Sequence, residues 1–184
     1  MKLYKLTKQD NTTQNDTLWG EGVTHEADGK STELCNNHWL HAYTDPLLAV
    51  IMNPAHANIG NPKLWECEGD VGLEQADKVG CTKLTTLKEI PLPQITPSQL
   101  IKFACLVARE IYPLWDKYDK DGVWLKWYDG GCQPDDAANA ANAANAACYA
   151  ANAASYAAYY AAYAANIKID LVNLARQAIM EDGK

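Results

Sequence analysis

The sequence predicts an α+β protein, in which a small, mostly antiparallel sheet module is followed by a helical part with a long alanine-rich helix. Up to residue 95, short apolar stretches of strand length alternate with turn residues. A helix-start signal then opens a run of apolar residues at helical spacing. From about residue 135 the chain is mostly alanine, which has the highest helix propensity. We therefore expect two domains, 1–95 and 96–184.

In the first module, alternation and turn signals predict short strands around one helix. Leu3–Leu6 alternates apolar and polar residues, as a half-buried strand does. A potential cap at Asp45 precedes a proline, which favours the first turn of a helix. We expect a short helix over Pro46–Met52, ending before Pro54. Three further strands are expected at Leu64–Glu68, Lys78–Leu84 and Lys88–Ile90.

The helical part begins with a recognisable cap. Thr96 and Gln99 stand at the two positions of a capping box, with a proline between them. Apolar residues then follow at helical spacing, so we expect an amphipathic helix over about 97–115. A last helix is expected over about 167–181, because Ile167, Leu171 and Leu174 share one face.

Between these helices, the alanine-rich segment is expected to form a helix over about 135–165 with one regular face. Asparagine and tyrosine recur there at alternating steps of three and four, which puts their side chains on one side of a helix. We name this face the Asn/Tyr ladder, and it comprises Asn142, Asn145, Tyr149, Asn152, Tyr156, Tyr159, Tyr163 and Asn166. A helix continuous to residue 181 would be a rod of roughly 70 Å at about 1.5 Å per residue. Otherwise it breaks near Asn166 and doubles back.

Two interpretations of the Asn/Tyr ladder stay open. In the first, the ladder is the solvated side of the helix, and the alanine face lets neighbouring helices approach closely. In the second, the ladder contacts a partner helix, a partner protein or a planar ligand, since tyrosine and tryptophan are enriched in interfaces. The candidate binding residues are Tyr149, Asn152, Tyr156, Tyr159 and Tyr163 of the ladder, Trp124 and Trp127 before it, and Tyr43.

Composition limits the partners and the compartment. The net charge of −7, without a block of lysine or arginine, argues against a nucleic-acid partner. No apolar run is long enough to cross a bilayer, and the first residues lack the apolar core of a secretory signal. The six cysteines follow no disulfide framework. We expect a cytoplasmic protein with reduced thiols, no membrane partner and no cofactor.

Cys35, His38 and His41 follow one another at a spacing that is common among zinc ligands. A structural zinc takes four nitrogen or sulfur ligands in a tetrahedral arrangement. His56 and Cys67 are available in the same module, but no second paired motif completes the set. We therefore expect no metal site, and we expect core or hydrogen-bonding roles for these side chains.

The segment around Glu66 and Glu68 is the best candidate for chemistry. Residues two apart share one face of a strand, and paired carboxylates raise each other's pKa and can act as acid and base. Folds that transfer ADP-ribose use a similar Glu-x-Glu strand. On this hypothesis Glu68 stabilises an oxocarbenium-like centre, while His41 and Tyr43 position a nucleotide. The alternative interpretation is that both carboxylates belong to a solvated face.

The first half of the chain also resembles uncharacterised phage and prophage proteins, some of which have an alanine-rich helical tail. The segments that carry the resemblance are Leu34-Cys35, Leu40-His41-Ala42-Tyr43, Asp45-Pro46, Leu64-Trp65-Glu66-Cys67-Glu68, Lys78-Val79-Gly80-Cys81 and Lys88-Glu89-Ile90. The chain departs from their pattern at Asn37-His38-Trp39, where they have a glycine. The resemblance implies a phage context, but no reaction.

Our leading hypothesis is a phage-encoded accessory binding protein in the cytoplasm of an infected or lysogenic bacterium. It would self-associate or bind a host protein through the Asn/Tyr ladder and the neighbouring aromatic residues. A counter-defence factor of this kind could also sequester a nucleotide-derived signal. The competing hypothesis is a nucleotide-acting enzyme related to ADP-ribosyl transfer, which would use Glu66, Glu68 and His41.

Overall fold

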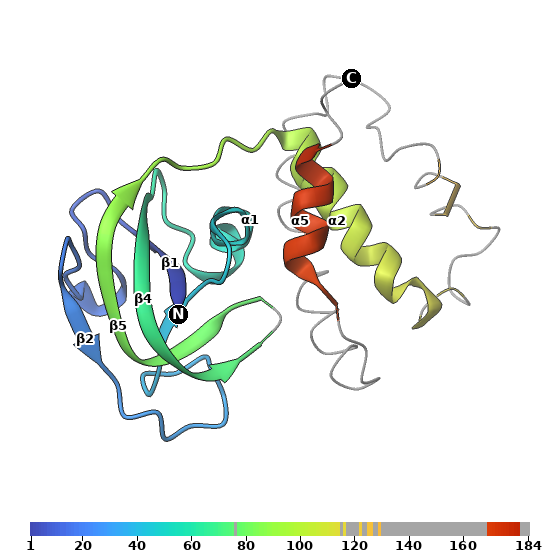
Figure 1. Cartoon of the computed structure of the whole chain (residues 1–184). Helices are drawn as coiled ribbons and strands as arrows, with labels where there is room; N and C mark the ends of the chain where they lie inside the picture. The colour runs from blue at the N-terminus through green and yellow to red at the C-terminus, as the bar shows by residue number, and fades with distance from the viewer. Residues whose placement is uncertain are drawn as a thin grey trace. The chain divides into compact units, whose positions relative to one another are not determined.

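The computed structural model describes residues 1–75, 77–114 and 169–180, together with residues 116, 122, 125, 126 and 129. The chain divides into two compact units, Met1–Gln94 and Ile95–Lys184 (Figure 1). The first unit contains an antiparallel sheet and the second contains helices, so the predicted α+β class is confirmed. The alanine-rich helix expected over about 135–165 lies outside the described residues.

The first unit is built on one five-stranded antiparallel sheet. Its long strands β4 and β5 pair with each other, and β1 pairs with β4. The short strands β3 and β2 pair with successive stretches in the first part of β5, Val79–Cys81 and Lys83–Thr85. The bounds are Lys2–Thr7 for β1, Thr24–Glu26 for β2, Leu40–Ala42 for β3, Lys63–Glu74 for β4 and Val79–Ile90 for β5. A short 3₁₀ turn, η1, spans Gln14–Asp16.

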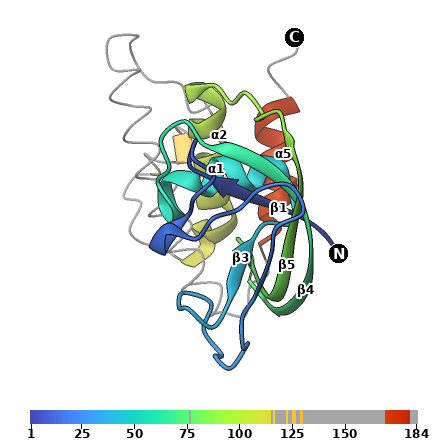
Figure 2. The same cartoon turned by 90° about the vertical axis from the view of Figure 1, so that its left-hand side faces the viewer.

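The two long strands are bent, and register shifts explain the bend. The β4–β5 pairing shifts after Glu66, after Asp70 and after Val71, and such bulges increase local twist and curvature. Figure 2 shows β4 and β5 as curved ribbons. The two strands expected at Lys78–Leu84 and Lys88–Ile90 are therefore one strand, and the strand expected at Leu64–Glu68 is the first part of β4.

The sheet closes on itself through β1. Tyr4 and Tyr43 exchange two backbone hydrogen bonds, with N···O distances of 2.9 and 2.8 Å. Because Tyr43 directly follows β3, the path of pairing runs from β1 through β4, β5 and β3 back to β1. The inner face of this path is the core of the unit, and it is lined by Leu3, Trp19, Ala42, Trp65, Cys67, Val79, Cys81 and Leu84.

Helix α1 (Pro46–His56) packs next to β1 and begins as predicted, with Asp45 Oδ1 accepting a hydrogen bond from the Leu47 amide at 2.8 Å. The prediction that it ends before Pro54 is wrong, because Pro54 lies inside its last turn. Proline removes one helical hydrogen bond there. Asn53 ties down this end of the helix instead, since its side chain bonds both backbone groups of Ile59, at 2.9 and 3.1 Å.

Trp39 occupies a slot formed by glycines. It is 8% exposed, and its Nε1 donates to the Ser31 carbonyl at 3.1 Å. A Cβ atom added at Gly72 would lie 2.6 Å from the indole, and one added at Gly80 would lie 3.0 Å from it. Real Cβ atoms essentially never lie within 3.0 Å of another heavy atom, so Trp39 favours glycine at residue 72. At residue 80 the added Cβ would be tight against the indole and would overlap the side chain of Leu34.

Lys5 is a buried cation in the core face. It is 8% exposed, its Nζ donates to the His41 carbonyl at 3.0 Å, and it lies 4.4 Å from the Trp19 ring centroid. Within the described residues no carboxylate forms an ion pair with it. Burial lowers the pKa of Lys5 from 10.5 to about 8, because a charged amine is poorly solvated there.

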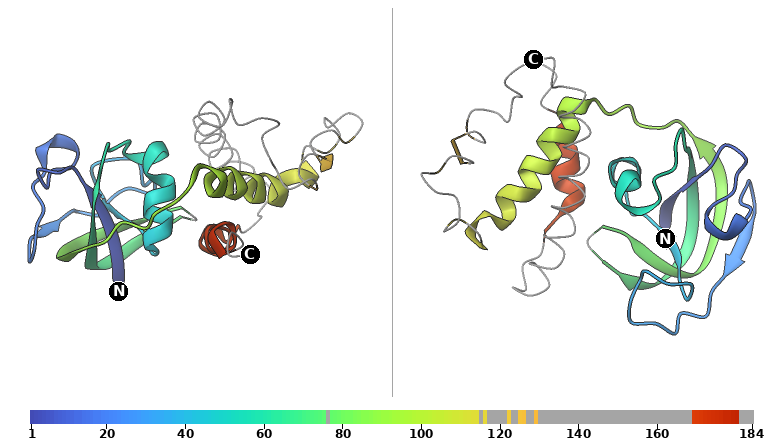
Figure 3. Two further views of the ribbon diagram at one scale, coloured as in Figure 1. Left: turned by 90° about the horizontal axis from the view of Figure 1, so that it is seen from above. Right: turned by 180° about the vertical axis from the view of Figure 1, so that it is seen from behind.

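The second unit contains a described helix pair. Helix α2 (Pro97–Ile111) has the predicted capping box and is followed by the 3₁₀ turn η2 (Tyr112–Leu114). It packs along α5 (Leu171–Met180), as Figures 1 and 3 show. Gln99 Nε2 reaches the Ile179 carbonyl at 3.5 Å, so the helices are antiparallel.

Helix α5 begins as a separate element. Residues 169 and 170 are not helical, and Asp170 Oδ1 accepts from the Asn173 amide at 2.9 Å, as an N-cap residue does. A helix continuous from residue 134 to 181 is therefore excluded. Within the described residues, no helix is both long and apolar enough to span a bilayer.

We predict that Gly80→Ala lowers the free energy of unfolding by about 1–3 kcal/mol, because the new methyl group overlaps Leu34 and Trp39. Urea unfolding measures the change. Gly60→Ala is the matched control, since no atom of the described residues lies within 4 Å of an added Cβ there, and it should change stability by less than about 0.5 kcal/mol. Equal free energies of unfolding for Gly80→Ala and Gly60→Ala would contradict the close packing around Gly80.

We predict that Lys5→Met raises the free energy of unfolding at pH 7 by about 1–3 kcal/mol, because it removes a buried charge. The pKa of Lys5 is about 8 in the folded state and near 10.5 when unfolded, so the unfolded state holds more protons between these values. The free energy of unfolding of the wild type should therefore increase relative to that of Lys5→Met as the pH rises above 8.

Denaturant unfolding of both proteins at several pH values measures this difference. Burial also raises the pKa of Cys67 to about 12 and that of Cys81 to about 11, which lowers stability above pH 9. Because the charge of Lys5 lowers the pKa of both thiols, this contribution differs between the two proteins, and the comparison is made between pH 7 and pH 9. The exposed Lys83→Met is the control, and a difference between wild type and Lys5→Met that does not depend on pH would refute the prediction.

Candidate functional site

The predicted carboxylates lie on the outward face of β4. Glu66 Oε2 is 3.0 Å from Lys2 Nζ and 3.8 Å from Lys88 Nζ, while Glu68 is exposed. The hydrogen bond from Lys2 lowers the pKa of Glu66, and the charges of both lysines act in the same direction. The pKa shift expected of a catalytic carboxylate pair is upward, so the contacts of Glu66 do not favour an acid role.

The structure does not gather Glu66, His41 and Tyr43 into one site. Tyr4 stands between Glu66 and Tyr43, because it pairs with Glu66 in β4 and with Tyr43 after β3. Two strand spacings separate Glu66 from Tyr43, or about 10 Å. The His41 ring is bonded to the Leu34 carbonyl through Nε2.

Tyr43 instead belongs to a chain of hydrogen bonds with His56 and Asp77. The Tyr43 hydroxyl lies 3.0 Å from His56 Nδ1, and His56 Nε2 lies 2.9 Å from Asp77 Oδ2. The three residues come from the end of β3, the end of α1 and the turn before β5. The rings of Tyr43 and His56 are also stacked, with centroids 5.8 Å apart. We call this arrangement the Tyr–His–Asp relay.

The relay is largely buried. Tyr43 is 7% exposed, and the side chains of His56 and Asp77 are 9% and 17% exposed. Burial raises the pKa of Tyr43, and the charge of Asp77 adds to the effect. Burial alone would raise the pKa of Asp77, but the hydrogen bond from His56 and the charges of His56 and Lys78 lower it below 3.8. Asp77 Oδ1 is buried and has no hydrogen-bond partner among the described residues.

These properties define what the relay can do. A carboxylate that accepts from Nε2–H leaves Nδ1 as the acceptor for the Tyr43 hydroxyl. Because its pKa is raised, Tyr43 remains a neutral phenol at neutral pH and is no nucleophile. The relay therefore joins three separate segments of the chain, and sequence reasoning missed it because positions 43, 56 and 77 form no local motif.

A second polar contact joins a loop to the start of β5. Lys78 Nζ lies 3.2 Å from the sulfur of Cys35, which is in the loop between β2 and β3. Lys78 is 8% exposed, whereas Cys35 is exposed. The sequence predicted a core or hydrogen-bonding role for Cys35 in preference to a zinc ligand. Its side chain is exposed and hydrogen-bonded, so it is not part of the core, and nothing in the spacing of residues 35 and 78 indicates this pairing.

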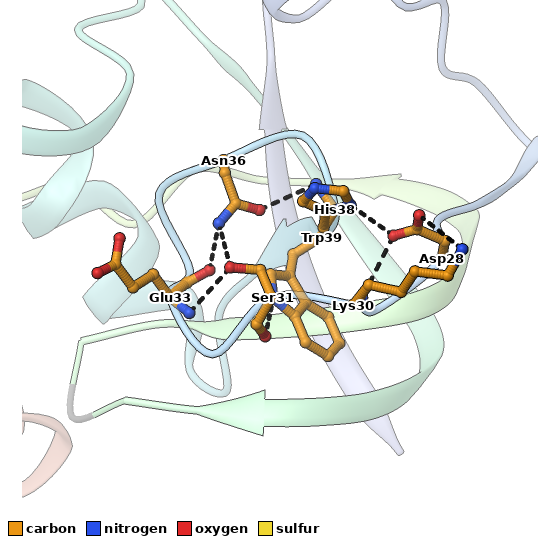
Figure 4. Close-up of polar contacts among 7 residues, drawn as sticks. All are labelled: Asp28, Lys30, Ser31, Glu33, Asn36, His38 and Trp39. Atoms are coloured by element: carbon orange, nitrogen blue, oxygen red, sulfur yellow. Dashed lines mark hydrogen bonds and ion pairs between the residues drawn. The ribbon is translucent and has the colours of Figure 1, made fainter.

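The three candidate zinc ligands point to different partners. His38 Nδ1 contacts Asp28 Oδ1 at 2.7 Å, as Figure 4 shows, while Cys35 contacts Lys78 and His41 contacts the Leu34 carbonyl. The loop is organised by its own side chains, since Asn36 Nδ2 donates to Ser31 Oγ and to the Glu33 carbonyl, both at 2.6 Å. Among the described residues, no group of three or more potential ligands is arranged to hold a metal ion.

The remaining predicted binding residues are not placed. Tyr149, Asn152, Tyr156, Tyr159, Tyr163, Trp124 and Trp127 lie outside the described residues. Of the predicted binding residues, the described part of the chain includes only Tyr43, whose hydroxyl is engaged with His56.

We predict that Asp77→Asn lowers the free energy of unfolding at pH 7 by about 1–3 kcal/mol, because it weakens a buried charged hydrogen bond. The lowered pKa of Asp77 means that its contribution is present above pH 3.8 and is lost as the pH falls through the folded-state value. Unfolding curves at pH 7 and pH 3 measure both effects. Asp70→Asn, at an exposed position, is the control. If Asp77→Asn were as much less stable than the wild type at pH 3 as at pH 7, the charged hydrogen bond between Asp77 and His56 would not be the cause.

Residues 1–98 match the profile of a family described as a domain of unknown function, DUF7666. This range covers more than half of the chain and includes all five described strands, the Tyr–His–Asp relay and the Cys35–Lys78 pair. No curated protein and no solved structure matches the chain significantly. The chain therefore belongs to the DUF7666 family.

Proposed function

We propose that the protein is a phage-encoded accessory binding protein that engages a protein partner through the Asn/Tyr ladder. The observation that carries the proposal is the antiparallel pairing of α2 and α5. The end of α2 and the start of α5 lie at the same end of this pair. The two helix ends that border the segment with the ladder therefore lie on the same side of the helix pair, which supports a role for that segment separate from the packing of α2 on α5.

The composition of the ladder supports a protein partner. Tyrosine provides a large, partly apolar surface with a polar end, and such residues dominate binding energy in many interfaces. The partner is a second copy of the chain or a host protein. The resemblance to phage and prophage proteins supports a counter-defence role in the cytoplasm of an infected or lysogenic bacterium, and sequestration of a nucleotide-derived signal is a variant of that role.

The enzyme hypothesis has weaker support. It requires Glu66, Glu68 and His41 to act on one substrate, but Glu66 is paired with two lysines and the His41 ring is bonded to a backbone carbonyl. Tyr43, its proposed nucleotide contact, is buried and bonded to His56. These contacts leave the outward face of β4 as a solvated, ion-paired surface.

We predict that the full chain forms a species larger than 20.3 kDa and that Tyr156→Ala/Tyr159→Ala returns it to the monomer mass, because the ladder loses its aromatic anchors. Light scattering over a range of concentrations, with small-angle scattering on the same samples, measures both. Glu68→Gln is the matched control and should behave as the wild type does. A wild-type chain that is monomeric at every concentration would exclude self-association and leave a host protein as the only partner to test.

The host-protein form of the proposal is tested with the same variants in infected cells. The Tyr156→Ala/Tyr159→Ala variant should lose the phenotype of the wild-type protein, and Glu68→Gln should retain it. The opposite result would refute the binding proposal and favour the enzyme, which requires the carboxylate of Glu68.

A further inference from the structure

We propose that the open edge of β2 binds an extended, lysine- or arginine-rich segment of a partner protein as an additional strand. This surface is separate from the Asn/Tyr ladder, so the inference is independent of the partner binding proposed above. It rests on the backbone groups that β2 directs away from β5 and on the negative charge of the segment that contains this strand.

β2 lies at the edge of the sheet. Among the described strands it pairs only with β5, and none lies beyond it in the order β1-β4-β5-β2 (Figure 1). Successive residues of an antiparallel strand direct their backbone groups to alternate sides. The Val23 carbonyl accepts from the Thr86 amide at 3.0 Å, and the Ala27 amide donates to the Thr82 carbonyl at 2.8 Å. Residues 23, 25 and 27 therefore direct these groups toward β5, and residues 24 and 26 direct theirs away from it.

The outward backbone groups are available to a partner. Among the described residues, the amides and carbonyls of Thr24 and Glu26 form no hydrogen bond on the side away from β5. Both side chains are exposed, so the described residues do not cover this edge. Extended peptides bind such edges through the same backbone hydrogen bonds that join strands within a sheet. The edge of β2 can therefore accept one further strand.

The charge of the surrounding segment indicates a cationic partner. Residues 21–33 contain four acidic residues and one lysine, a net charge of −3 in a chain with a net charge of −7. The acidic residues are Glu21, Glu26, Asp28 and Glu33, and all four are exposed. Opposite charges on directly opposed residues stabilise strand pairing, and like charges destabilise it. A basic strand fits this edge, whereas a second copy of the chain would bring the same negative charge to it.

Glu26 also indicates which residues of the partner are basic. Its carboxylate is 73% exposed and lies 3.7 Å from Lys83 Nζ, so it has room for a second cation. Directly opposed residues of an antiparallel pair extend their side chains to the same face of the sheet. The partner residues that bond to Thr24 and Glu26 therefore share the exposed face with them. The residues between them would lie on the face of His25, whose ring packs against Trp19 with centroids 4.6 Å apart. We expect basic residues at every second position of the partner strand.

The test uses the full chain and the peptide acetyl-TKTKTKT-amide. Fluorescence anisotropy of the labelled peptide measures the affinity, and hydrogen exchange followed by NMR measures the amides of Thr24 and Glu26. At saturating peptide, exchange at these two amides should slow by about tenfold or more, because both become hydrogen-bonded. The acidic peptide acetyl-TETETET-amide should bind at least about tenfold more weakly, because like charges would then be opposed.

Two N-methylated peptides separate strand pairing from the attraction of charges alone. Methylation of the lysine backbone nitrogens removes the donors that would face β2 and should lower the affinity by about tenfold or more. Methylation of the internal threonine nitrogens removes donors that face away from β2, so it should change the affinity little. Equal affinities of the two methylated peptides would overturn the proposal, since charge alone would then explain the binding.

Glu26→Pro tests the edge itself. It removes an amide that points away from β5, where an edge strand tolerates proline, and it should lower the affinity by about tenfold or more. Glu26→Val keeps the amide and loses the charge, so it should lower the affinity by only about threefold. Glu74→Val removes an exposed carboxylate from β4 and should bind the peptide as the wild type does.

The wild-type chain alone is sufficient to refute the proposal, even if Glu26→Pro fails to fold. Absence of peptide binding, or binding without slower exchange at Thr24 and Glu26, would overturn it. Slower exchange of the same two amides at high protein concentration without peptide would also overturn it, because the occupant of the edge would then be a second copy of the chain.

Discussion

The backbone pairing of Tyr4 with Tyr43 is the constraint on which the first unit depends. It brings β1 against the chain after β3, so the sheet encloses its inner face. Because the sheet encloses its inner face, the inward-facing side chains of its strands form a core, although no single strand is hydrophobic throughout. It also leaves few unpaired strand edges. The same pairing fixes which face of the sheet Tyr43 occupies and brings its hydroxyl to His56 at the end of α1.

Closure also determines the positions of three lysines. Lys2 lies outside and pairs with Glu66, Lys5 lies inside without a carboxylate, and Lys78 is buried against a thiol. In a chain with a net charge of −7, two buried cations without carboxylate ion pairs among the described residues are unusual. Lys5 is held by a carbonyl and an aromatic ring, which offset only part of the loss of hydration. Lys78 is held by the Cys35 sulfur, and its charge lowers the pKa of the neighbouring Asp77.

The Tyr–His–Asp relay and the Cys35–Lys78 pair differ in their exposure to solvent. The relay is buried, and its phenol stays neutral, so it connects three segments of the chain without offering a group to solvent. The Cys35 side chain is exposed, and its sulfur accepts a hydrogen bond from the buried Lys78 Nζ at 3.2 Å. The two lie next to each other in sequence at Asp77 and Lys78, and the charge of Lys78 helps to lower the pKa of Asp77.

The sequence by itself determined the class of the fold and the local elements. Alternation predicted β1, the cap at Asp45 predicted the start of α1, and the capping box at Thr96 predicted the start of α2, because each signal acts within a few residues. Only the tertiary structure decided how far β4 and β5 extend and how α1 continues past Pro54. Bulges and side-chain contacts from distant segments compensate there for residues that normally end an element. The pairs Tyr43–His56, His56–Asp77 and Cys35–Lys78 also required the fold, since closure of the sheet brings together residues that no local spacing relates.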